Sequence, residues 1–344
     1  MIEYNNFVNL FYTNVCNLNS NQVLIFIIFT LIMAIAVDII FGELPGKIHP
    51  VVIMGSIISF FKNMFIKMKN RISGLMLVIC CVISTGVLLY LFYYIGCFNT
   101  ILFIVIYTIL LSSSFSIKML LDTASDVKRD LDESLEKARR SVSYLVSRNT
   151  DELTESFIVS ATIESLTENI TDSYVAPIFY YFIFTLIITF CHFQNELYFL
   201  LLIPVLYRLF NTLDAMVGYK NDELINIGFV PAKIDDILNY IPSRIAGLYV
   251  VISAFLLKLD GKNSFNVMMR DARNCPSPNS GYTMASTAGA LNIQLVKKDT
   301  YILGNNNKDI DKNDIEKAVN LSKTTIILFT ITIILLLILV GVTS

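Results

Sequence analysis

Apolar runs of membrane-spanning length limit the fold of this chain more than any other feature. One helix needs about 20 mostly apolar residues to cross the hydrocarbon core of a bilayer. Charged residues make up 16% of the chain, below the roughly 25% of an average soluble domain. The sequence therefore predicts an all-α, polytopic helical membrane protein that forms one integral membrane domain over residues 1–344. The expected spans are residues 22–41, 75–95, 101–117, 177–193, 197–210 and 325–342.

The positions of Lys and Arg predict the orientation of these spans. The first 21 residues contain neither, whereas the segment 42–74 contains several. Because cytoplasmic loops carry the excess of Lys and Arg, we expect the N-terminus outside and the segment 42–74 inside. Residues 118–173 and 258–323 then form helical cytoplasmic inserts of a multi-pass protein in the cell (plasma) membrane.

The apolar segment 245–257 is short for a span. Both of its flanking segments are expected in the cytoplasm, so it does not cross the membrane alone. Either it is re-entrant or interfacial, or Tyr282–Leu295 completes a hairpin with it. We favour a segment that does not cross.

Composition excludes several classes of function. No strongly basic domain stands apart from the membrane part, so nucleic acid is not an expected partner. The six cysteines form no CxxC pair, which supports neither a disulfide framework nor a zinc site. With two histidines in the chain, a histidine-rich metal centre is excluded as well. The sequence leaves the oligomeric state open.

Three carboxylates lie on one face of a predicted helix just before the span that begins at Pro177. Glu164, Glu168 and Asp172 follow one another at intervals of four residues. The negative charges of these carboxylates repel one another unless a cation lies between them, and Mg²⁺ prefers carboxylate oxygens as ligands. We therefore expect a magnesium site here, with the polar Asn169 beside it. The alternative is a solvated helix face.

The polar segment Asn211–Lys220 follows an apolar helix that we expect to end at Phe210. Lipid penalises charge, so Asp214 is expected to line a cavity or to face water. Gly218 permits close approach of the backbone. An ordinary helix exit with a polar cap is the alternative interpretation.

A third group contains Arg270 and Arg273, three residues apart, followed by the run Pro276–Gly281. Two prolines, a glycine and several Ser and Asn residues predict a structured loop. Arg grips phosphate or carboxylate with two parallel hydrogen bonds, so the pair is a candidate anion site. The alternative is a surface turn beside ordinary cytoplasmic charges. That would explain the two arginines, but not why Pro, Ser, Asn and Gly are so dense in the run that follows them.

Weaker candidates flank these groups. Asp38 lies near the cytoplasmic end of the first span, where an ionisable residue suggests a function. His49 is a candidate base or a hydrogen-bonded loop residue. Asp235 and Asp236 are acidic candidates, although they can also pair with nearby basic residues.

Taken in order, these segments resemble the membrane-bound adenosylcobinamide-phosphate synthases. The resemblance runs from Ala34 to Gly304. It is carried by Asp38, His49-Pro50, Ala161–Asn169 with Asp172, Asn211–Asn221, Asp235-Asp236, Pro242-Ser243-Arg244, Arg270–Arg273 and Pro276–Gly281. The chain departs from the family pattern at Cys275, where a His is usual, and at Tyr282, where a Trp is usual. It departs again at Val296–Thr300, where a Gly-rich segment is usual.

The resemblance implies an ATP-dependent ligase of cobalamin biosynthesis. Such an enzyme joins a carboxylate of adenosylcobyric acid to 1-amino-2-propanol or its O-phosphate, with Mg²⁺ as cofactor and ATP as co-substrate. By this resemblance, Asp38, His49, Glu164 and Asp214 are catalytic candidates, and Glu164, Glu168, Asp172 and Asp214 are metal ligands. The substrate-binding candidates are Asn169, Asn211, Lys220, Asp235, Asp236, Arg244, Arg270, Arg273, Ser277 and Asn279.

A transporter or sensor on the same scaffold is the alternative function. A membrane protein with an acidic cluster would suit ion-coupled transport. However, coupling carboxylates usually lie near the middle of the bilayer, whereas these lie at span ends and in cytoplasmic segments. We therefore favour the ligase, with its active site on the cytoplasmic side.

Overall fold

The computed structural model describes residues 18, 20–47, 49–146, 149–191, 196–219 and 221–343. They form two compact units. Unit 1 comprises Met1–Ser116, Pro177–Ile237 and Thr332–Ser344, and unit 2 comprises Ile117–Ala176 and Leu238–Ile331. The membrane domain predicted over residues 1–344 thus contains two units, which are described separately below.

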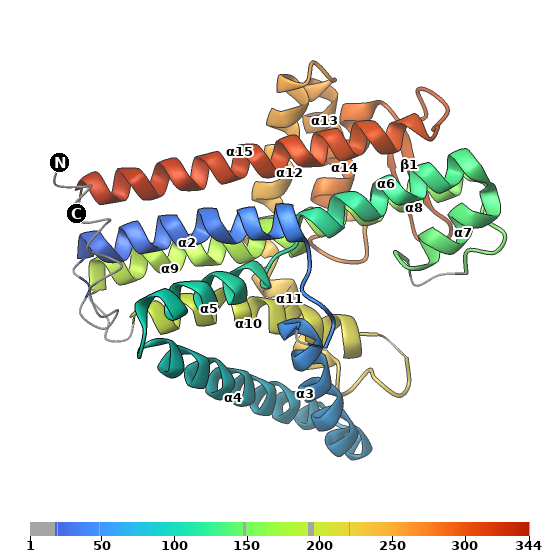
Figure 1. Ribbon diagram of the computed structural model, residues 1–344. Coiled ribbons are helices and arrows are strands. Elements are labelled where there is room, and N and C mark those ends of the chain that lie inside the picture. The colour runs from blue at the N-terminus through green and yellow to red at the C-terminus, as the bar shows by residue number, and fades with distance from the viewer. Residues whose placement is uncertain are drawn as a thin grey trace. The chain divides into compact units, whose positions relative to one another are not determined.

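Unit 1 is a set of apolar helices (Figure 1). Helix α2 packs against α5, α3 packs against α4, and α10 contacts α3, α4 and α5. Rings from two helices meet in its core, where Phe26 lies 4.9 Å from Tyr107 between ring centroids. The helices are α2 (Ser20–Phe41), α3 (Pro50–Phe65), η2 (Ile66–Met68), α4 (Arg71–Gly96), α5 (Thr100–Ser112), α9 (Ala176–Cys191), α10 (Glu196–Val217) and α11 (Phe229–Leu238).

Six helices in the described residues are long and apolar enough to cross a membrane, or seven if the bent pair α11 and α12 (Tyr240–Leu256) is one span. The fold is therefore the all-α, polytopic membrane protein that the sequence predicts. The set of helices differs from the expected one in two places. Residues 42–74, expected as a loop, contain α3, and Pro50–Met68 passes as a candidate span. Helix α5 ends at Ser112, so the segment 101–117 is shorter as a helix than expected.

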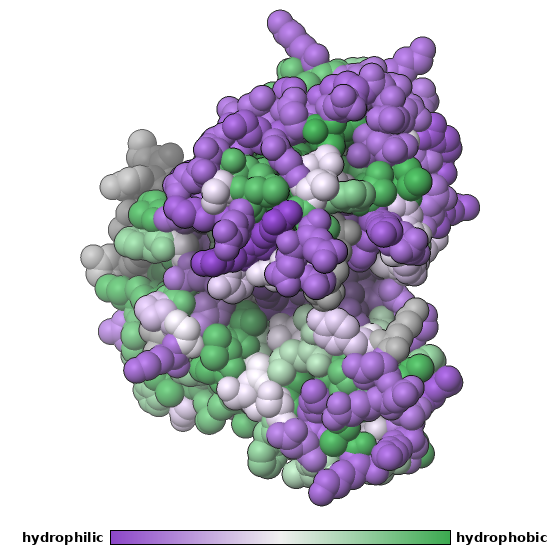
Figure 2. Space-filling view, turned by 90° about the vertical axis from the view of Figure 1, so that its right-hand side faces the viewer, coloured by the Kyte–Doolittle hydropathy of each residue, from purple (hydrophilic) through white to green (hydrophobic). Residues whose placement is uncertain are grey.

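Many apolar side chains on these helices are exposed within the protein. On α4, Ile72, Ile83 and Val87 each expose more than half of their surface. A soluble protein rarely leaves such a continuous apolar surface in water, whereas lipid accepts it. The surface of unit 2 around α6 (Lys118–Glu133) and α7 (Leu135–Ser143) differs, because hydrophilic residues dominate it in the upper part of Figure 2.

Unit 2 surrounds one short helix, α14 (Gly281–Leu291), in which every residue is buried. This helix contacts α8, α12, α13 and both strands. Its small side chains allow close approach, since a Cβ at Gly281 would lie 2.0 Å from the Ala272 carbonyl oxygen. The other elements are α6, α7, α8 (Glu155–Ile170), η3 (Thr171–Val175), α12, α13 (Gly261–Asp271), η4 (Ala272–Asn274), β1 (Gln294–Lys297), β2 (Tyr301–Gly304) and α15 (Asn313–Thr343), whose end belongs to unit 1.

The strands β1 and β2 form an antiparallel hairpin that the sequence analysis did not predict. Leu295 and Leu303 are paired and fully buried, while Lys297 pairs with Tyr301 beside the turn. Asp299 has a φ of 57°, a left-handed conformation that Asp tolerates better than most residues. The two strands have only four residues each, so the alternation of apolar and polar residues that marks a strand is hard to recognise in the sequence.

A π-helical turn, η3, joins α8 to α9 in one 37-residue helix, Glu155–Cys191. The Ala176 N–H bonds to the Thr171 carbonyl, five residues earlier. Pro177 accounts for the turn, because a proline ring clashes with the carbonyl four residues before it in a regular α-helix. The extra residue rotates later side chains by about 100°. The helix begins at Glu155.

We expect Gly281→Ala to destabilise unit 2. The added Cβ would meet backbone atoms of Ala272 rather than a flexible side chain. Overpacking of this kind costs about 1–3 kcal/mol, so the thermal unfolding midpoint in detergent should fall. Gly46→Ala is the matched control, because no atom lies within 4 Å of its Cβ position. Equal midpoints for the two variants would contradict the packing described for α14.

Candidate functional site

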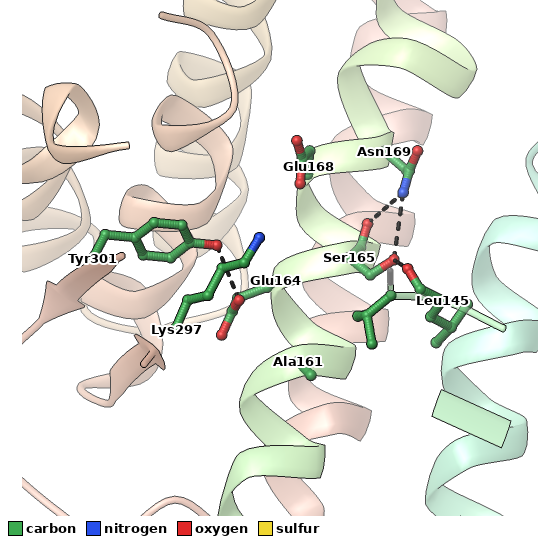
Figure 3. A pocket seen from close by; sticks show the side chains of 9 residues that line it. Leu145, Ala161, Glu164, Ser165, Glu168, Asn169, Lys297 and Tyr301 are labelled. Carbon is green, nitrogen blue, oxygen red and sulfur yellow. Dashed lines mark hydrogen bonds between the residues drawn. The ribbon is translucent and has the colours of Figure 1, made fainter. Parts of the chain in front are cut away.

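Two glutamates of α8 line a cavity of about 250 Å³ inside unit 2 (Figure 3). Glu164 and Glu168 lie on one face of the helix, with Tyr301 and Lys297 of the hairpin opposite them. The lining residues are Leu145, Val146, Ala161, Glu164, Ser165, Glu168, Asn169, Lys297 and Tyr301. Of the sequence-predicted residues, this cavity brings together Glu164, Glu168 and Asn169.

Both oxygens of the Glu164 carboxylate accept hydrogen bonds. The Ser160 hydroxyl donates to Oε1 at 2.6 Å, and the Tyr301 hydroxyl donates to Oε2 at 3.0 Å. The Ser160 hydroxyl in turn accepts from the Val296 N–H of β1 at 2.9 Å. Glu164 is only 5% exposed, so these bonds fix a buried carboxylate in one orientation.

Glu168 lies one helical turn further and is only partly buried. None of the described residues donates a hydrogen bond to its carboxylate, while Lys297 and Glu164 are close enough to act on its charge. Two neighbouring carboxylates repel each other, and one lysine offsets only one negative charge. Mg²⁺ commonly takes one or two carboxylates and completes its shell with water and phosphate oxygens. The pair therefore fits a magnesium ion, with the carboxylate oxygens of Glu164 and Glu168 as its protein ligands.

Two further groups near the cavity keep their protons at neutral pH. Burial raises the pKa of the Tyr301 hydroxyl, and the charge of Glu164 and the hydrogen bond to it raise it further. Burial likewise raises the pKa of the Cys275 thiol to about 11, against the lowering effect of a hydrogen bond with Ser280. Tyr301 is thus a hydrogen-bond donor, and Cys275 is no thiolate nucleophile at neutral pH.

Asp172 does not line this cavity. It lies in the π-turn η3, at the end of α8. In the described part of the chain, no three His, Cys, Asp or Glu residues are grouped so as to hold a metal ion. The ligand set expected from the sequence is therefore not assembled from protein groups alone, and the described cluster is the pair Glu164 and Glu168.

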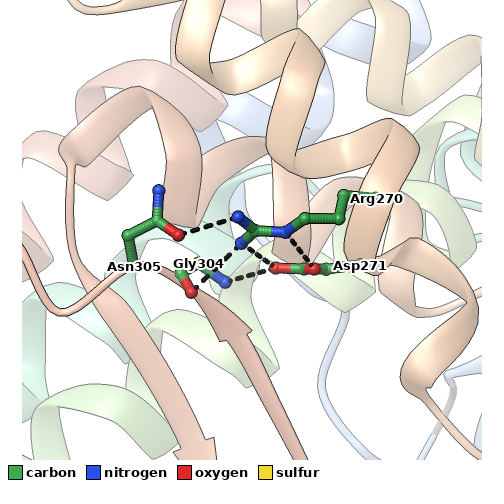
Figure 4. Close-up of polar contacts among 4 residues, drawn as sticks. All are labelled: Arg270, Asp271, Gly304 and Asn305. Carbon is green, nitrogen blue, oxygen red and sulfur yellow. Dashed lines mark hydrogen bonds and ion pairs between the residues drawn. The ribbon is translucent and has the colours of Figure 1, made fainter.

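Arg270 is held by its neighbour rather than directed to an open anion site (Figure 4). Its guanidinium donates to both carboxylate oxygens of Asp271, at 2.6 and 2.7 Å. A further bond to Asn305 Oδ1, at 2.8 Å, ties the end of α13 to the segment after β2. Asp271 also accepts from the Gly304 N–H at 2.8 Å. Arg273 lies in η4, not on the helical face of Arg270, and is exposed.

The loop before α14 is organised by Arg244 of α12. Its guanidinium donates to Asn279 Oδ1 at 3.0 Å and lies between two rings, 3.5 Å from the Tyr240 centroid and 4.3 Å from that of Tyr282. The Ser277 hydroxyl accepts from the Asn279 N–H at 3.2 Å. The loop predicted at Pro276–Gly281 is therefore structured, and Arg244 and Asn279 hold its shape.

The remaining predicted residues belong to unit 1. Asp38 is buried at 2% exposure in α2. Asn211 and Asp214 lie in the last turns of α10, which continues to Val217 and not only to Phe210. Asp235 and Asp236 lie in α11, where Asp236 pairs with Lys233 at 3.2 Å. Lys220 lies outside the described residues.

Comparison with known proteins identifies the family of the chain. The family model described as CobD/Cbib protein matches residues 31–322. The chain belongs to the CobD/Cbib family. A protein of Methanothermobacter thermautotrophicus, named probable cobalamin biosynthesis protein CobD, is 46% identical over 301 residues, which cover 88% of this chain and 95% of that protein. A Methanocaldococcus jannaschii protein of the same name is 37% identical over 314 residues, with the same two coverages. No solved structure matches the chain.

Sequence reasoning missed the residues opposite the glutamates. Tyr301, Lys297 and Ser160 carry no motif, and the hairpin that supplies two of them was not recognised. The usable signal was the pair Leu295 and Leu303, which flank the short polar run Lys297–Thr300 with its Asp.

We expect Tyr301→Phe to lower the stability of unit 2. The change leaves Glu164 Oε2 without its hydrogen bond from the phenol. A hydrogen bond to a charged group contributes about 1.5–3 kcal/mol, so thermal unfolding should occur at a lower temperature. Tyr144→Phe is the control, because this tyrosine is 89% exposed. An unchanged midpoint for Tyr301→Phe would show that the bond contributes little.

Asp271 should make the protein sensitive to acid. Burial alone would raise the pKa of this carboxyl, but hydrogen bonds from Arg270 and the Gly304 N–H lower it below its ordinary value of 3.8. The ionised group thus stabilises the fold above the unfolded-state pKa, and the stabilisation is lost as pH falls through the folded-state pKa. Asp271→Asn should cost about 1–3 kcal/mol at pH 7.

The difference between wild type and Asp271→Asn should shrink below about pH 4. Denaturant unfolding in mild detergent at pH 7 and pH 3 measures it. Asp309→Asn, at an exposed position, is the control. A difference that is the same at both pH values would exclude an ionised Asp271 as its source.

Proposed function

We propose that this protein is an ATP-dependent ligase of cobalamin biosynthesis. It would join adenosylcobyric acid to 1-amino-2-propanol or its O-phosphate and release adenosylcobinamide or its phosphate. The observation that carries the proposal is membership of the CobD/Cbib family, whose relatives are named probable cobalamin biosynthesis proteins and align with this chain over most of their length. The acidic cavity of unit 2 supports it, because phosphate chemistry commonly uses carboxylates with Mg²⁺.

The chemistry requires activation of a carboxylate. A carboxylate and an amine do not condense in water, so the propionate oxygen first attacks the terminal phosphorus of ATP and releases ADP. The amine nitrogen then attacks the acyl carbon of this acyl phosphate. As the C–N bond forms, the nitrogen loses a proton to a base and the C–O bond to phosphate breaks, which gives the amide and inorganic phosphate.

Glu164 and Glu168 are the residues that would hold the metal in this proposal. Mg²⁺, when bound, shields the charge of the phosphates. Lys297 lies beside the same carboxylates. Once a bound cation neutralises the charge of Glu168, the Lys297 ammonium would contact a phosphate oxygen of the substrate. Tyr301 and Ser160 keep Glu164 in its orientation, as supporting hydrogen bonds around metal ligands usually do.

The arginines divide into two roles. Arg270 and Arg244 are engaged with Asp271 and Asn279, so they shape the loops on either side of η4. Arg273 is exposed and offers its guanidinium to a substrate anion. The protein would lie in the plasma membrane, and the Lys and Arg residues of the inserts support a location of unit 2 in the cytoplasm, where ATP is available.

An end-point assay on the detergent-purified protein tests the proposal. Adenosylcobyric acid, ATP, Mg²⁺ and aminopropanol phosphate are incubated together, and the products are identified by mass spectrometry. We expect a new amide and an equal loss of ATP. If neither free nor phosphorylated aminopropanol yields an amide, the ligase is excluded and transport or sensing becomes the better hypothesis.

Glu168→Gln should reduce turnover more than about 100-fold, because it removes a charged ligand while preserving shape. Glu164→Ala should abolish it. Glu152→Gln, at an exposed position before α8, is the control and should retain wild-type turnover. Raising the Mg²⁺ concentration should partly restore Glu168→Gln but not Glu164→Ala. Full activity in either variant would remove the acidic cavity from the mechanism.

A further inference from the structure

Arg208 of α10 is a partly buried arginine for which the described residues supply no ion pair. Its Nε–H is buried and has no hydrogen-bond partner in the described part of the chain. The contact of its Nη1 with Asn211 Oδ1 is long, at 3.4 Å. A buried donor without a partner costs free energy, and an ionisable residue in a membrane-length helix usually has a functional reason.

His49 supplies a second donor near this guanidinium. It caps α3, and its Nδ1 accepts the Val51 N–H at 3.1 Å. In the neutral ring, this bond assigns the proton to Nε2, which is then a donor. Burial lowers the pKa of His49, the exposed Glu43 raises it and Arg208 lowers it, so that it lies below its ordinary value of 6.5. His49 is therefore neutral at pH 7 and is a donor rather than a base.

These donors belong to two helices of the same unit that are in contact. Helix α10 packs against α3, where Met216 Sδ lies 3.8 Å from the Cβ position of Gly55. Because the Asn211 side-chain oxygen faces Arg208, its amide nitrogen also has N–H groups to donate. The group thus contains several donors and one positive charge, which is the chemistry of an oxyanion site.

We propose that Arg208, His49 and Asn211 form a binding site for a substrate oxyanion, a phosphate or a carboxylate. Arg208 binds it through Nε–H and an Nη–H as a two-point fork, and His49 donates through Nε2–H. The inference rests on the proposed function only for the identity of the anion, which is a phosphate of ATP, the phosphate of aminopropanol phosphate, or the corrinoid carboxylate. It gives His49 a positioning role, whereas the sequence left it as a candidate base or a hydrogen-bonded loop residue.

Calorimetric titration of the full-length protein in detergent tests the site directly. The probes are a non-hydrolysable ATP analogue, aminopropanol phosphate, adenosylcobyric acid and inorganic phosphate, each added alone. We expect Arg208→Gln to weaken one of the first three at least about 10-fold, and Arg208→Lys to weaken it less. The affected probe identifies the source of the oxyanion. Arg140→Gln, whose side chain is 78% exposed, should bind every probe as wild type does.

Histidine NMR separates loss of the site from loss of the fold. The chain has two histidines, so a His192→Gln background gives one labelled signal, that of His49. Arg208→Gln should raise the pKa of His49, Arg208→Lys should leave it low, and the bound probe should shift the signal in wild type only. A signal with unfolded chemical shifts in both Arg208 variants would show that Arg208 is a structural residue and would overturn the proposal.

Two results would overturn the site in the titrations. One is equal affinity of wild type and Arg208→Gln for every probe, and the other is the absence of binding to wild type. If the proposed ligase function is wrong but the oxyanion site exists, the results differ from these two. In that case wild type forms no amide, yet Arg208→Gln still loses affinity for inorganic phosphate relative to wild type.

Discussion

Unit 2 depends on the close packing of α14 against its neighbours. Small side chains let the backbones of α12, α13 and η4 approach this helix, and a single methyl group at Gly281 would collide with Ala272. The helix in turn contacts α8 and the hairpin, the two elements that face each other across the acidic cavity. The positions of Glu164 and Tyr301 are thus fixed by a buried helix that carries no charged residue itself.

The two glutamates of the cavity differ in the way their charge is handled. Glu164 is buried and receives hydrogen bonds on both oxygens, so its geometry is determined by the protein. Glu168 is left to electrostatic interactions with Lys297 and Glu164. A fixed carboxylate beside one that can move suits Mg²⁺, because substrate phosphate oxygens complete its coordination shell and change during a reaction. Arg208 in unit 1 presents the opposite case, a positive charge for which the described residues supply no carboxylate.

The sequence was sufficient for the fold class, the family and the glutamates of α8, because apolar length and helical spacing are local signals. It did not show that Asp172 lies in a π-turn before Pro177 and does not line the cavity of Glu164 and Glu168. It also could not show that the Arg270 guanidinium binds the Asp271 carboxylate. Side chains of adjacent residues meet only in some backbone conformations, and the sequence does not give the conformation at the end of a helix. The partners of Glu164 come from far along the chain, and spacing does not predict such contacts.

The hairpin makes the chemistry of the cavity sensitive to the length of one turn. Lys297 and Tyr301 are cross-strand partners on either side of it, and their side chains reach the same cavity. Strand side chains alternate between faces, so inserting or deleting one turn residue would invert the second strand relative to the first. Tyr301 would then leave the cavity while Lys297 remained. The length of this turn therefore decides which side chain faces Glu164, without any change in the helices.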